Sequence, residues 1–450
     1  NRYLAETDKD MYVHLDTLLG YQNDWTVTRQ HDIKAAVGYQ HRFSETNMLS
    51  LSLMTNQAFG GEARQRELAG KMFAKSRNYT AANILGESRY QISLHYDDKQ
   101  LGGAENLKMK AGIDVLADND ADHYRAEYNE ENRDTTFLNY HRDYLSLFTE
   151  PFVQLQYQYK NWDFSLMERP QIYSNVQWDM MAAASPLLLH SHTQFANLAK
   201  ANIGYIVKTR HRFDLSYSYD VKRPDYKQFS PMVRLTNTEG EFIQGNDSLR
   251  PEKVHKVNLR YSYRKDEHIL TTVDIFYGHR KDKIEKVVIV NETGHKQIET
   301  LKTFTNDNVQ HQLGGTLRLK LNYESLEAET WSSMAWERFT YYNGKAPKDE
   351  ISYQLGLMLN AHLNKVVDLT SSLVYVSPTR SAYNEKNEYI GANLRLTYKS
   401  PVGVNVFIEA NDIINKPRTE NTWNESMTYM KVKEVVENRN CLGLGIRYEW

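Results

Sequence analysis

Two histidines in one short segment are the first residues whose type and spacing could support chemistry. His190 and His192 flank Ser191, so an extended backbone would place both imidazoles on the same side. A stable metal site needs three or four ligands and outer groups that orient them, and no further ligand cluster lies near this segment in the sequence. We therefore expect a polar loop here, with no metal, cofactor or catalytic site.

Motifs for covalent or phosphate chemistry are missing from the sequence. It has no CxxC pair, no glycine-rich phosphate loop and no nucleophile elbow. Its single cysteine, Cys441, excludes an internal disulfide framework. The formal net charge of −2 argues against a nucleic-acid partner. These features predict a protein that is not an enzyme and does not bind nucleic acid.

Aromatic and amide side chains in the long polar segments suit the recognition of a solute. An aromatic ring can stack on a sugar ring or a planar chelate, although solvated loops also contain such residues for no specific purpose. The candidates for recognition are Tyr226, Phe242, Gln244, Tyr341, Tyr342 and Trp423. We expect segments 221–253 and 280–308 to lie over an entrance and to contact the solute or a lid partner.

The elements that must position these residues are strands. Near the C-terminus, Leu442, Leu444 and Ile446 alternate with Gly443 and Gly445. Such period-two alternation indicates a strand with one apolar and one polar face. The same alternation recurs along the chain and predicts about eighteen strands.

The polar faces of these strands carry charges that a dry core would not accept. Burial of an unpaired lysine or arginine is costly, whereas a watery lumen accepts it. The mean hydropathy of −0.67 excludes a helical membrane protein, and 31 tyrosines suit strands and a bilayer interface. The residues expected to point inward are Lys108, Lys110, Arg260, Arg318, Lys320, Arg395 and Arg447.

Short and long connections alternate along nearly the whole chain. Short turns are expected at 44–47, 160–163, 209–212, 264–267, 324–326, 364–366 and 399–401. Long polar loops are expected at 60–78, 117–149, 176–193, 221–253, 280–308, 342–350, 378–387 and 413–440. In up-and-down antiparallel strands this pattern puts all short turns on one rim, as in bacterial outer-membrane barrels. A soluble sandwich or propeller would explain any single strand but not this alternation.

A motif in the second half resembles the barrel of TonB-dependent outer-membrane receptors, specifically the outer membrane β-barrel family typical of Bacteroidota. The motif residues are Arg223, Pro224, Tyr226, Pro231, Gly245, Asn246, Leu249, Pro251 and Glu252. The resemblance extends over residues 195–450 and includes the Asn411-Asp412-Ile413-Ile414-Asn415 segment. Because proline and Gly-Asn pairs shape turns, we expect the motif to serve the loop backbone and not a ligand.

The resemblance implies an all-β, transmembrane, antiparallel up-and-down barrel of about twenty-two strands with a plugged lumen. We expect residues 1–450 to form one outer-membrane barrel domain, with the plug and N-terminal regions absent from this sequence. The implied function is receptor-mediated uptake of a metal chelate, glycan or peptide. A passive pore or a structural barrel subunit is the alternative, and an enzyme at the barrel rim is a weaker one.

The resemblance also implies partners and a location. The location is the cell outer membrane, and the partners are outer-membrane lipid, a plug domain, the TonB complex through the missing N-terminal part, and a surface lipoprotein. The final strand ends in Tyr448 and Trp450, which we expect to be read by the barrel-insertion machinery.

Overall fold

The computed structural model describes most of the chain. The described residues are 2–13, 17–69, 77–130, 136–179, 187–230, 233–235, 241–293, 297–341, 347–380, 384–400, 403–411, 413–414, 418–423, 430–435 and 441–448. Within them, no helix has the length and hydrophobicity of a membrane-crossing helix.

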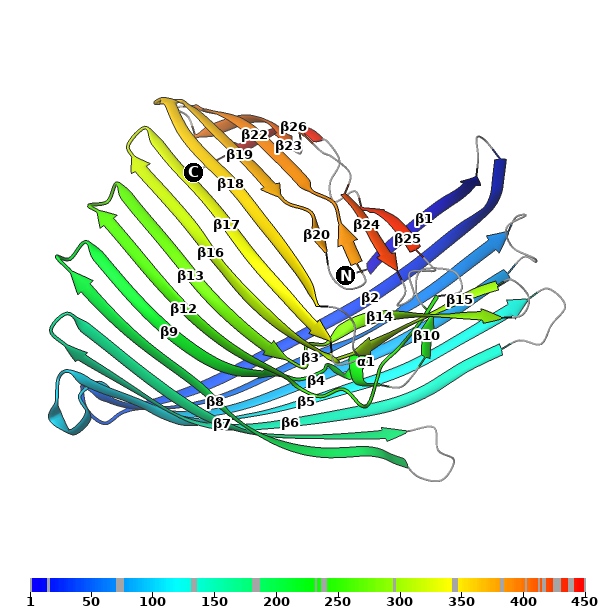
Figure 1. Ribbon diagram of the computed structural model, residues 1–450, viewed down its shortest axis with the longest axis horizontal. Helices are drawn as coiled ribbons and strands as arrows, with labels where there is room; N and C mark the ends of the chain where they lie inside the picture. Colours follow the sequence, from blue (N-terminus) through cyan, green and yellow to red (C-terminus); the bar gives the residue numbers. More distant parts are fainter. Residues whose placement is uncertain are drawn as a thin grey trace.

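One 18-stranded sheet dominates the molecule (Figure 1). Neighbouring strands of this sheet are antiparallel throughout the described residues, and each strand pairs with the one named after it in the next sentence. The strands are β1 (Arg2–Val13), β2 (Thr17–Arg42), β3 (Asn47–Ala69), β4 (Arg77–Asp98), β5 (Leu107–Glu130), β6 (Thr136–Tyr159), β7 (Trp162–Asp179), β8 (Leu187–Val207), β9 (His211–Lys222), β12 (Glu252–Lys265), β13 (Ile269–Lys281), β16 (Asn308–Tyr323), β17 (Leu326–Tyr341), β18 (Lys348–Asn364), β19 (Val367–Val376), β22 (Tyr389–Lys399), β23 (Val404–Asn411) and β26 (Cys441–Tyr448).

Smaller elements lie in the connections of this sheet. One four-stranded sheet has the order β10-β11-β15-β14, in which β11 and β15 are parallel, and a second has the order β20-β21-β24-β25. Their bounds are β10 (Val233–Leu235), β11 (Glu241–Gln244), β14 (Glu285–Thr293), β15 (Gln297–Thr305), β20 (Thr379–Arg380), β21 (Asn384–Lys386), β24 (Arg418–Trp423) and β25 (Met430–Val435), with helix α1 (Tyr226–Phe229) and the 3₁₀ turn η1 (Leu101–Gly103).

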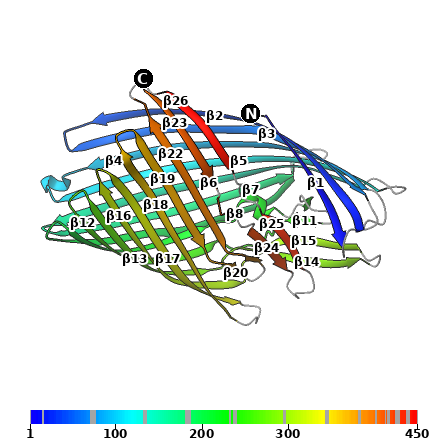
Figure 2. The same ribbon diagram turned by 90° about the horizontal axis from the view of Figure 1, so that it is seen from above.

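The large sheet curves so that strands β2 to β6 face strands β12 to β18 (Figures 1 and 2). The pairings of the described residues begin with β1 and finish with β26, and none joins these two end strands. The predicted eighteen strands of an up-and-down sheet are therefore confirmed. The number twenty-two stays an expectation from the resemblance.

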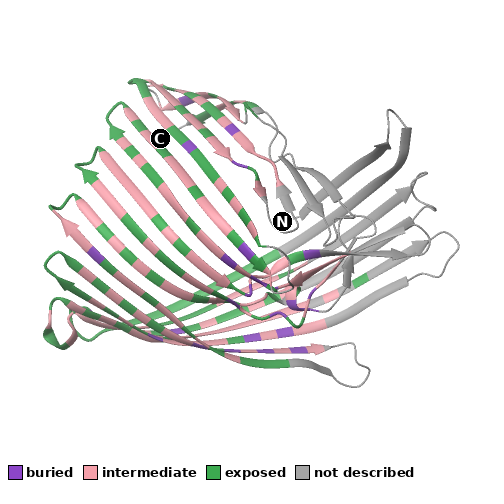
Figure 3. Ribbon diagram, viewed as in Figure 1, coloured by how far each residue is buried: buried purple, intermediate pink, exposed green. Residues whose placement is uncertain are grey.

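Apolar side chains cover the outside of the curved sheet, and polar ones line its inside. Exposed and less exposed residues alternate along the strands (Figure 3). On β12, Val257 and Leu259 are exposed and apolar, whereas Arg260, the next residue after Leu259, pairs with Asp274 on β13. The described residues that are buried are mostly polar, so there is no dry hydrophobic core in this part of the chain. A membrane supplies the missing apolar environment for the outer face.

Six of the seven predicted short turns are confirmed, because each lies between strands that are paired in one hairpin. The seventh, 399–401, includes Pro401, which lies outside the described residues, although the flanking strands β22 and β23 are paired. The prediction missed an eighth connection on the same rim, between β4 and β5, where Gly102 and Gly103 adopt φ of 64° and 85°. Glycine suits this left-handed backbone because it has no Cβ.

Several of the predicted long loops are wrong as loops. β3 and β4 stay paired from Asn47↔Asp98 to Leu68↔Arg77, and β5 and β6 stay paired as far as Tyr128↔Thr136. These segments were predicted as loops because they are polar. Strands that extend beyond the membrane are polar on both faces, so the alternation of apolar and polar residues disappears there. Backbone hydrogen bonds continue there, since they do not depend on side-chain polarity.

Candidate functional site

The inner face of β4 to β7 carries a series of polar contacts. His95 Nε2 on β4 lies 2.9 Å from Asp114 Oδ1 on β5. Arg169 on β7 places Nη2 4.0 Å from Asp114 Oδ2 and Nη1 3.2 Å from Glu150 Oε2 on β6. The side chains of His95 and Asp114 point into the barrel, because their strand neighbours Leu94 and Ile113 are apolar and exposed. Arg169 and Glu150 lie on the same face, since they pair with these residues across the strands. Charges that a dry core would not accept are thus paired along a polar wall.

The series continues from the wall to the segment that follows β9. Gln171 Nε2 donates to Glu150 Oε1, and Gln171 Oε1 accepts a hydrogen bond from Arg223 Nη1. Arg223 is the first residue of the motif found in the sequence. The motif is therefore connected to the inner wall by its arginine.

Aromatic rings surround the Arg223 guanidinium. Its Cζ lies 4.6 Å from the ring centroid of Tyr173 and 5.8 Å from that of Phe148. Tyr173 is held in turn, with its Oη 3.0 Å from Tyr144 Oη, and Asn175 Nδ2 donates to Tyr144 Oη at 2.9 Å. Tyr144, Tyr173 and Asn175 are all buried. Cation–π contacts of this kind gain strength when water is excluded.

A cavity of about 210 Å³, called the Arg223 cavity below, opens beside these rings. Its lining residues are Tyr144, Tyr173, Asn175, His192, Gln194, Arg223, Pro224, Phe229, Asp247, Leu249, Arg250 and Pro251.

Two donors and one acceptor at the Arg223 cavity are left without partners. Arg223 Nε and Nη2 and Asn175 Oδ1 are shielded from solvent and make no hydrogen bond to the described residues. Burial lowers the pKa of the Arg223 guanidinium, although arginine stays charged at any physiological pH. A buried polar group without a partner costs about 1–3 kcal/mol. A ligand with an anionic oxygen group would recover that cost at Arg223.

The second half of the motif fixes the backbone around the cavity. A Cβ on Gly245 would lie 2.3 Å from the carbonyl oxygen of Ser230, so only glycine fits this close approach. The amide of Asn246 donates to Gln228 O at 2.7 Å, and its Nδ2 donates to Phe304 O at 2.8 Å. The chain after β11 is thereby tied both to α1 and to the end of β15.

Glu252 and Arg250 extend this connection toward segment 280–308. The buried Glu252 accepts from the amide of Ile284 at 2.7 Å and lies 3.7 Å from Arg280 Nε. Arg250 Nη2 lies 3.0 Å from Asp282 Oδ1. The observed contacts of Glu252 and Asn246 are with backbone and neighbouring loop groups, whereas Arg223, Pro224, Leu249 and Pro251 line the Arg223 cavity.

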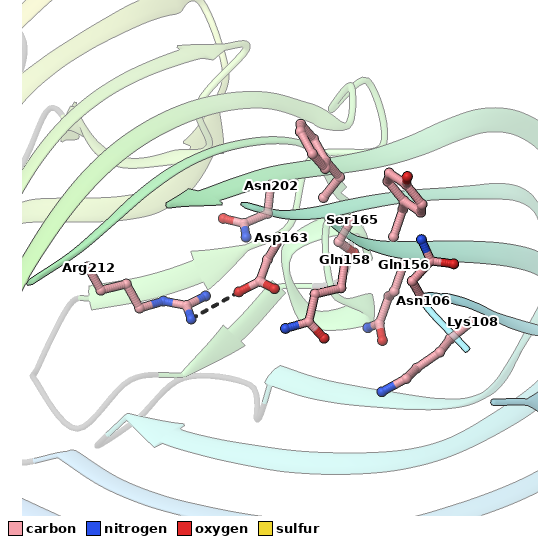
Figure 4. Close-up of a pocket in the computed structure, with 10 residues that line it drawn as sticks. Asn106, Lys108, Gln156, Gln158, Asp163, Ser165, Asn202 and Arg212 are labelled. Carbon is pink, nitrogen blue, oxygen red and sulfur yellow. Dashed lines mark hydrogen bonds and ion pairs between the residues drawn. The ribbon is translucent and has the colours of Figure 1, made fainter. Parts of the chain in front are cut away.

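A second hollow lies lower on the inner wall, near the short turns. It has a volume of about 260 Å³, and its lining includes Lys108, Gln156, Gln158, Asp163 and Arg212 (Figure 4). Arg212 Nη1 donates to Asp163 Oδ2 at 3.1 Å across β9 and β7. The wall is therefore polar from the short-turn rim up to the Arg223 cavity.

The recognition residues expected from the sequence are not gathered at this cavity. Gln244 at the end of β11 and Tyr341 at the end of β17 are half-buried, and neither lines the Arg223 cavity. The side chains of Tyr226, Phe242, Trp423 and Tyr448 lie outside the described part of the chain, as do residues Pro231, Tyr342 and Trp450. Among the side chains that are described, no group of three or more His, Cys, Asp or Glu is placed to hold a metal ion.

Sequence reasoning missed the wall residues of the site. Tyr144 lay inside segment 117–149, which was expected to be a loop, and Tyr173 and Asn175 were not assigned. A signal was present, because Gln171, Tyr173, Asn175 and Gln177 occupy every second position of β7. All four are buried and face inward. Alternating polar residues with one buried face are what a strand lining a polar lumen requires.

Comparison with protein families gives one match over most of the chain. The model of the "Outer membrane protein beta-barrel family" matches residues 29–448. A comparison with curated proteins gave no match.

Solved structures share the fold at low sequence identity. The chain resembles the structure titled "Copper transporter OprC" with 12% identity and a TM-score of 0.57, covering 98% of this chain and 78% of that one. It resembles the siderophore receptor PiuA from Acinetobacter baumannii with 10% identity and a TM-score of 0.60, covering 99% of this chain and 79% of that one. It resembles the ferric yersiniabactin uptake receptor FyuA from Yersinia pestis with 10% identity and a TM-score of 0.56, covering 100% of this chain and 78% of that one. At such identities the likeness concerns the fold.

Proposed function

The chain belongs to the outer membrane protein β-barrel family, and from this we propose that it forms the barrel of a TonB-dependent receptor for nutrient uptake. Its location is the outer membrane, which its strands cross. The polar inner wall is the path along which the solute passes, and the outer loops are where the solute is first held.

The substrate class we propose is a metal chelate with anionic oxygen groups. The three similar structures are titled as a copper transporter, a siderophore receptor and a ferric yersiniabactin receptor. Their fold supports uptake in general, and the chemistry of this chain supports the narrower choice. A carboxylate or phenolate oxygen of a chelate can accept from the guanidinium in the Arg223 cavity.

The observation that carries the proposal is the unpartnered guanidinium at the Arg223 cavity. Nε and Nη2 of Arg223 are free of protein acceptors, while its Nη1 is held by Gln171 and its flat face by Tyr173. The two unused donors of one guanidinium can bind a planar anionic group in bidentate fashion once a local movement exposes them to the cavity. The aromatic walls of the cavity add a stacking surface for a planar ring.

Segments 221–253 and 280–308 are proposed to cover the entrance and to contact the solute together. Support comes from the parallel pairing of β11 with β15, which joins the two segments. It also comes from Asn246 and Arg250, which bind across to the second segment. Loops that are joined in this way would move as one body when a solute binds.

Energy coupling through a plug and the TonB complex belongs to the same proposal, as do contacts with a surface lipoprotein and the insertion machinery. Nothing in these residues performs such coupling by itself. The inner wall near Arg212 and Asp163 offers paired charges of both signs to a polar domain inside the barrel.

The test is uptake by cells that express the complete receptor gene with Arg223→Gln. We expect uptake of the cognate ferric or cupric chelate to fall about tenfold or more, because a buried charge-assisted hydrogen bond is worth about 1.5–3 kcal/mol. Arg210→Gln is the matched control, since Arg210 lies in an exposed turn at the opposite end of β9.

Two further arms separate the parts of the proposal. Uptake that is unchanged in cells without TonB would make the protein a passive pore. Shortening both 221–253 and 280–308 while keeping β9, β12, β13 and β16 should abolish binding. Normal binding by that variant would put recognition in another domain or a partner.

A further inference from the structure

The residue types on the outward faces of β9, β12, β13, β16 and β17 change from aliphatic to aromatic to basic toward the long-loop rim. Register pairs their residues into rows across the five strands. An aliphatic row, containing Leu215, Leu259, Ile275 and Met334, is followed by a row that brings in Tyr217, Tyr277 and Trp336. Aromatic residues at this position on a barrel mark the boundary between hydrocarbon and headgroups.

Basic side chains occupy the next two rows. The first contains Tyr219, His255, His279, His311 and Arg338, and the second contains Lys253 and Lys281. Each row lies roughly 7 Å further along the strands, because two residues of a strand span that distance. These six basic residues, His255, His279, His311, Arg338, Lys253 and Lys281, are called the outer basic belt below.

The histidines of the belt form one continuous row of neighbouring, mutually tilted rings. The ring centroids of His279 and His311 lie 4.7 Å apart, and those of His255 and His279 lie 6.1 Å apart. Tyrosines of the aromatic row hold the outer two rings, with Tyr217 Oη 2.9 Å from His255 Nδ1 and Tyr277 Oη 2.8 Å from His311 Nδ1. The imidazoles are thus fixed immediately above the aromatic row.

The belt has an excess of positive charge on its surface. Lys253 and Lys281 are exposed, and neither forms an ion pair with a described residue. Arg338 forms one long ion pair, with its Nε 3.9 Å from Oδ1 of Asp349, its cross-strand partner on β18. On the same outward face, Glu168 of β7 is the next carboxylate, two strands beyond β9. Neutral lipid would give Lys253 and Lys281 no anionic partner at this level.

A metal ion does not explain the three histidines. No group of three or more ligating side chains in the described part of the chain has the arrangement for a metal. Nδ1 of His255 and Nδ1 of His311 are hydrogen-bonded to the hydroxyls of Tyr217 and Tyr277. Nε2 of each ring, together with the amines, remains suited to an oxygen acceptor of negative charge.

We propose that the outer basic belt binds the phosphate group of lipid headgroups in the outer leaflet of the membrane. The cations and imidazoles lie at headgroup depth because they directly follow the aromatic row, and their charge complements a phosphate monoester. The contact fixes the depth and rotation of the barrel wall under segments 221–253 and 280–308. This role is independent of which solute the receptor carries.

The test compares lipid retention by the purified complete chain in detergent, measured by native mass spectrometry. The probes are phosphatidic acid, which carries a phosphate monoester, and phosphatidylcholine. The variant is Lys253→Gln with Lys281→Gln. The matched control is Lys256→Gln with Lys320→Gln, which removes the same charge from the inner faces of β12 and β16. A heat-modifiability gel establishes that both variants are folded.

The expected result is a loss of preference for phosphatidic acid of about fivefold for each outward lysine removed. The inward control should keep the preference of the native chain, and Arg338→Gln alone should lower it about fivefold. Equal retention by the outward variant and the control would overturn the proposal. Full displacement of phosphatidic acid by inorganic phosphate would also overturn it, because the belt would then be a site for free anions.

Discussion

The Arg223 guanidinium is held by an amide and by two aromatic rings. Gln171 accepts a hydrogen bond from one nitrogen, and the rings of Tyr173 and Phe148 lie against the guanidinium. The other two nitrogens are shielded from solvent and have no partner among the described residues. An exposed arginine would lose most of its electrostatic energy to water. Under the proposed function, burial among aromatic rings makes the same charge a selective donor for an anionic ligand.

Gly245 provides the prediction at the residue scale. We expect Gly245→Ala to displace the segment over the Arg223 cavity, because the new Cβ would lie 2.3 Å from Ser230 O and 2.7 Å from Gln228 O. Overpacking of this kind costs about 1–3 kcal/mol. Limited proteolysis should show faster cleavage in 226–250, with the membrane sheet still resistant. Gly86→Ala is the control, since its nearest atom would be Ala121 Cβ at an ordinary 3.6 Å. Equal protection of both variants would refute the tight approach.

At the scale of the strand, alternation alone separates lipid from lumen. Arg395 points inward, with its Nη1 3.9 Å from Glu409 Oε2 and its Cζ 3.7 Å from the ring centroid of Phe407. Its neighbour Leu396 points outward and is 44% exposed. Side chains one position apart on β22 therefore meet opposite environments.

Leu396 provides the prediction at this scale. We expect Leu396→Arg to lower the free energy of unfolding by about 2–4 kcal/mol if the site lies near the bilayer midplane. Thr397→Arg should be nearly neutral, because residue 397 faces the lumen opposite Asp368. Urea titration of the chain folded in vesicles measures both. In a cysteine-labelling check, a Leu396→Cys thiol that reacts freely while an Arg395→Cys thiol is protected would reverse the assignment of faces.

At the scale of the whole molecule, connections far apart in sequence combine into shared structures on the long-loop side. The segment after β9 and the segment after β13 join through β11 and β15 (Figures 1 and 2). Connections after β19 and β23 likewise contribute β20, β21, β24 and β25 to one small sheet. Ordering a long connection by itself costs conformational entropy with no pairing in return. Pairing two connections orders both of them and adds backbone hydrogen bonds between them.

The last strand provides the prediction at the whole-molecule scale. β26 is an end strand of the described sheet, paired with β23 from Val404↔Tyr448 to Asn411↔Cys441. We expect deletion of Trp450 to lower the fraction of heat-modifiable, folded barrel in cells, because a terminal aromatic helps the insertion machinery to recognise this strand. Trp450→Phe should keep the native fraction. Insertion of the deletion variant at the native rate and yield would make Trp450 a simple interface residue.

The amino-acid sequence by itself determined the strand architecture of this protein. Alternation in segments such as 404–411 and 442–446 predicted strands, and the seven short turns fixed their order on one rim. The inward lysines and arginines predicted a polar interior, which the pairs Arg260–Asp274 and Arg318–Glu329 now occupy. These features are local, because the side-chain period and turn chemistry depend on a few neighbouring residues.

Only the tertiary structure decided which residues form the Arg223 cavity and the outer basic belt. Tyr144, Tyr173 and Arg223 are far apart in sequence and meet because β6, β7 and the segment after β9 share one inner surface. His255, His279 and His311 lie side by side only because hairpin register aligns three strands. Register between strands depends on pairings across the sheet, and a one-residue slip would move each histidine to the opposite face. Spacing along a single chain does not contain that information.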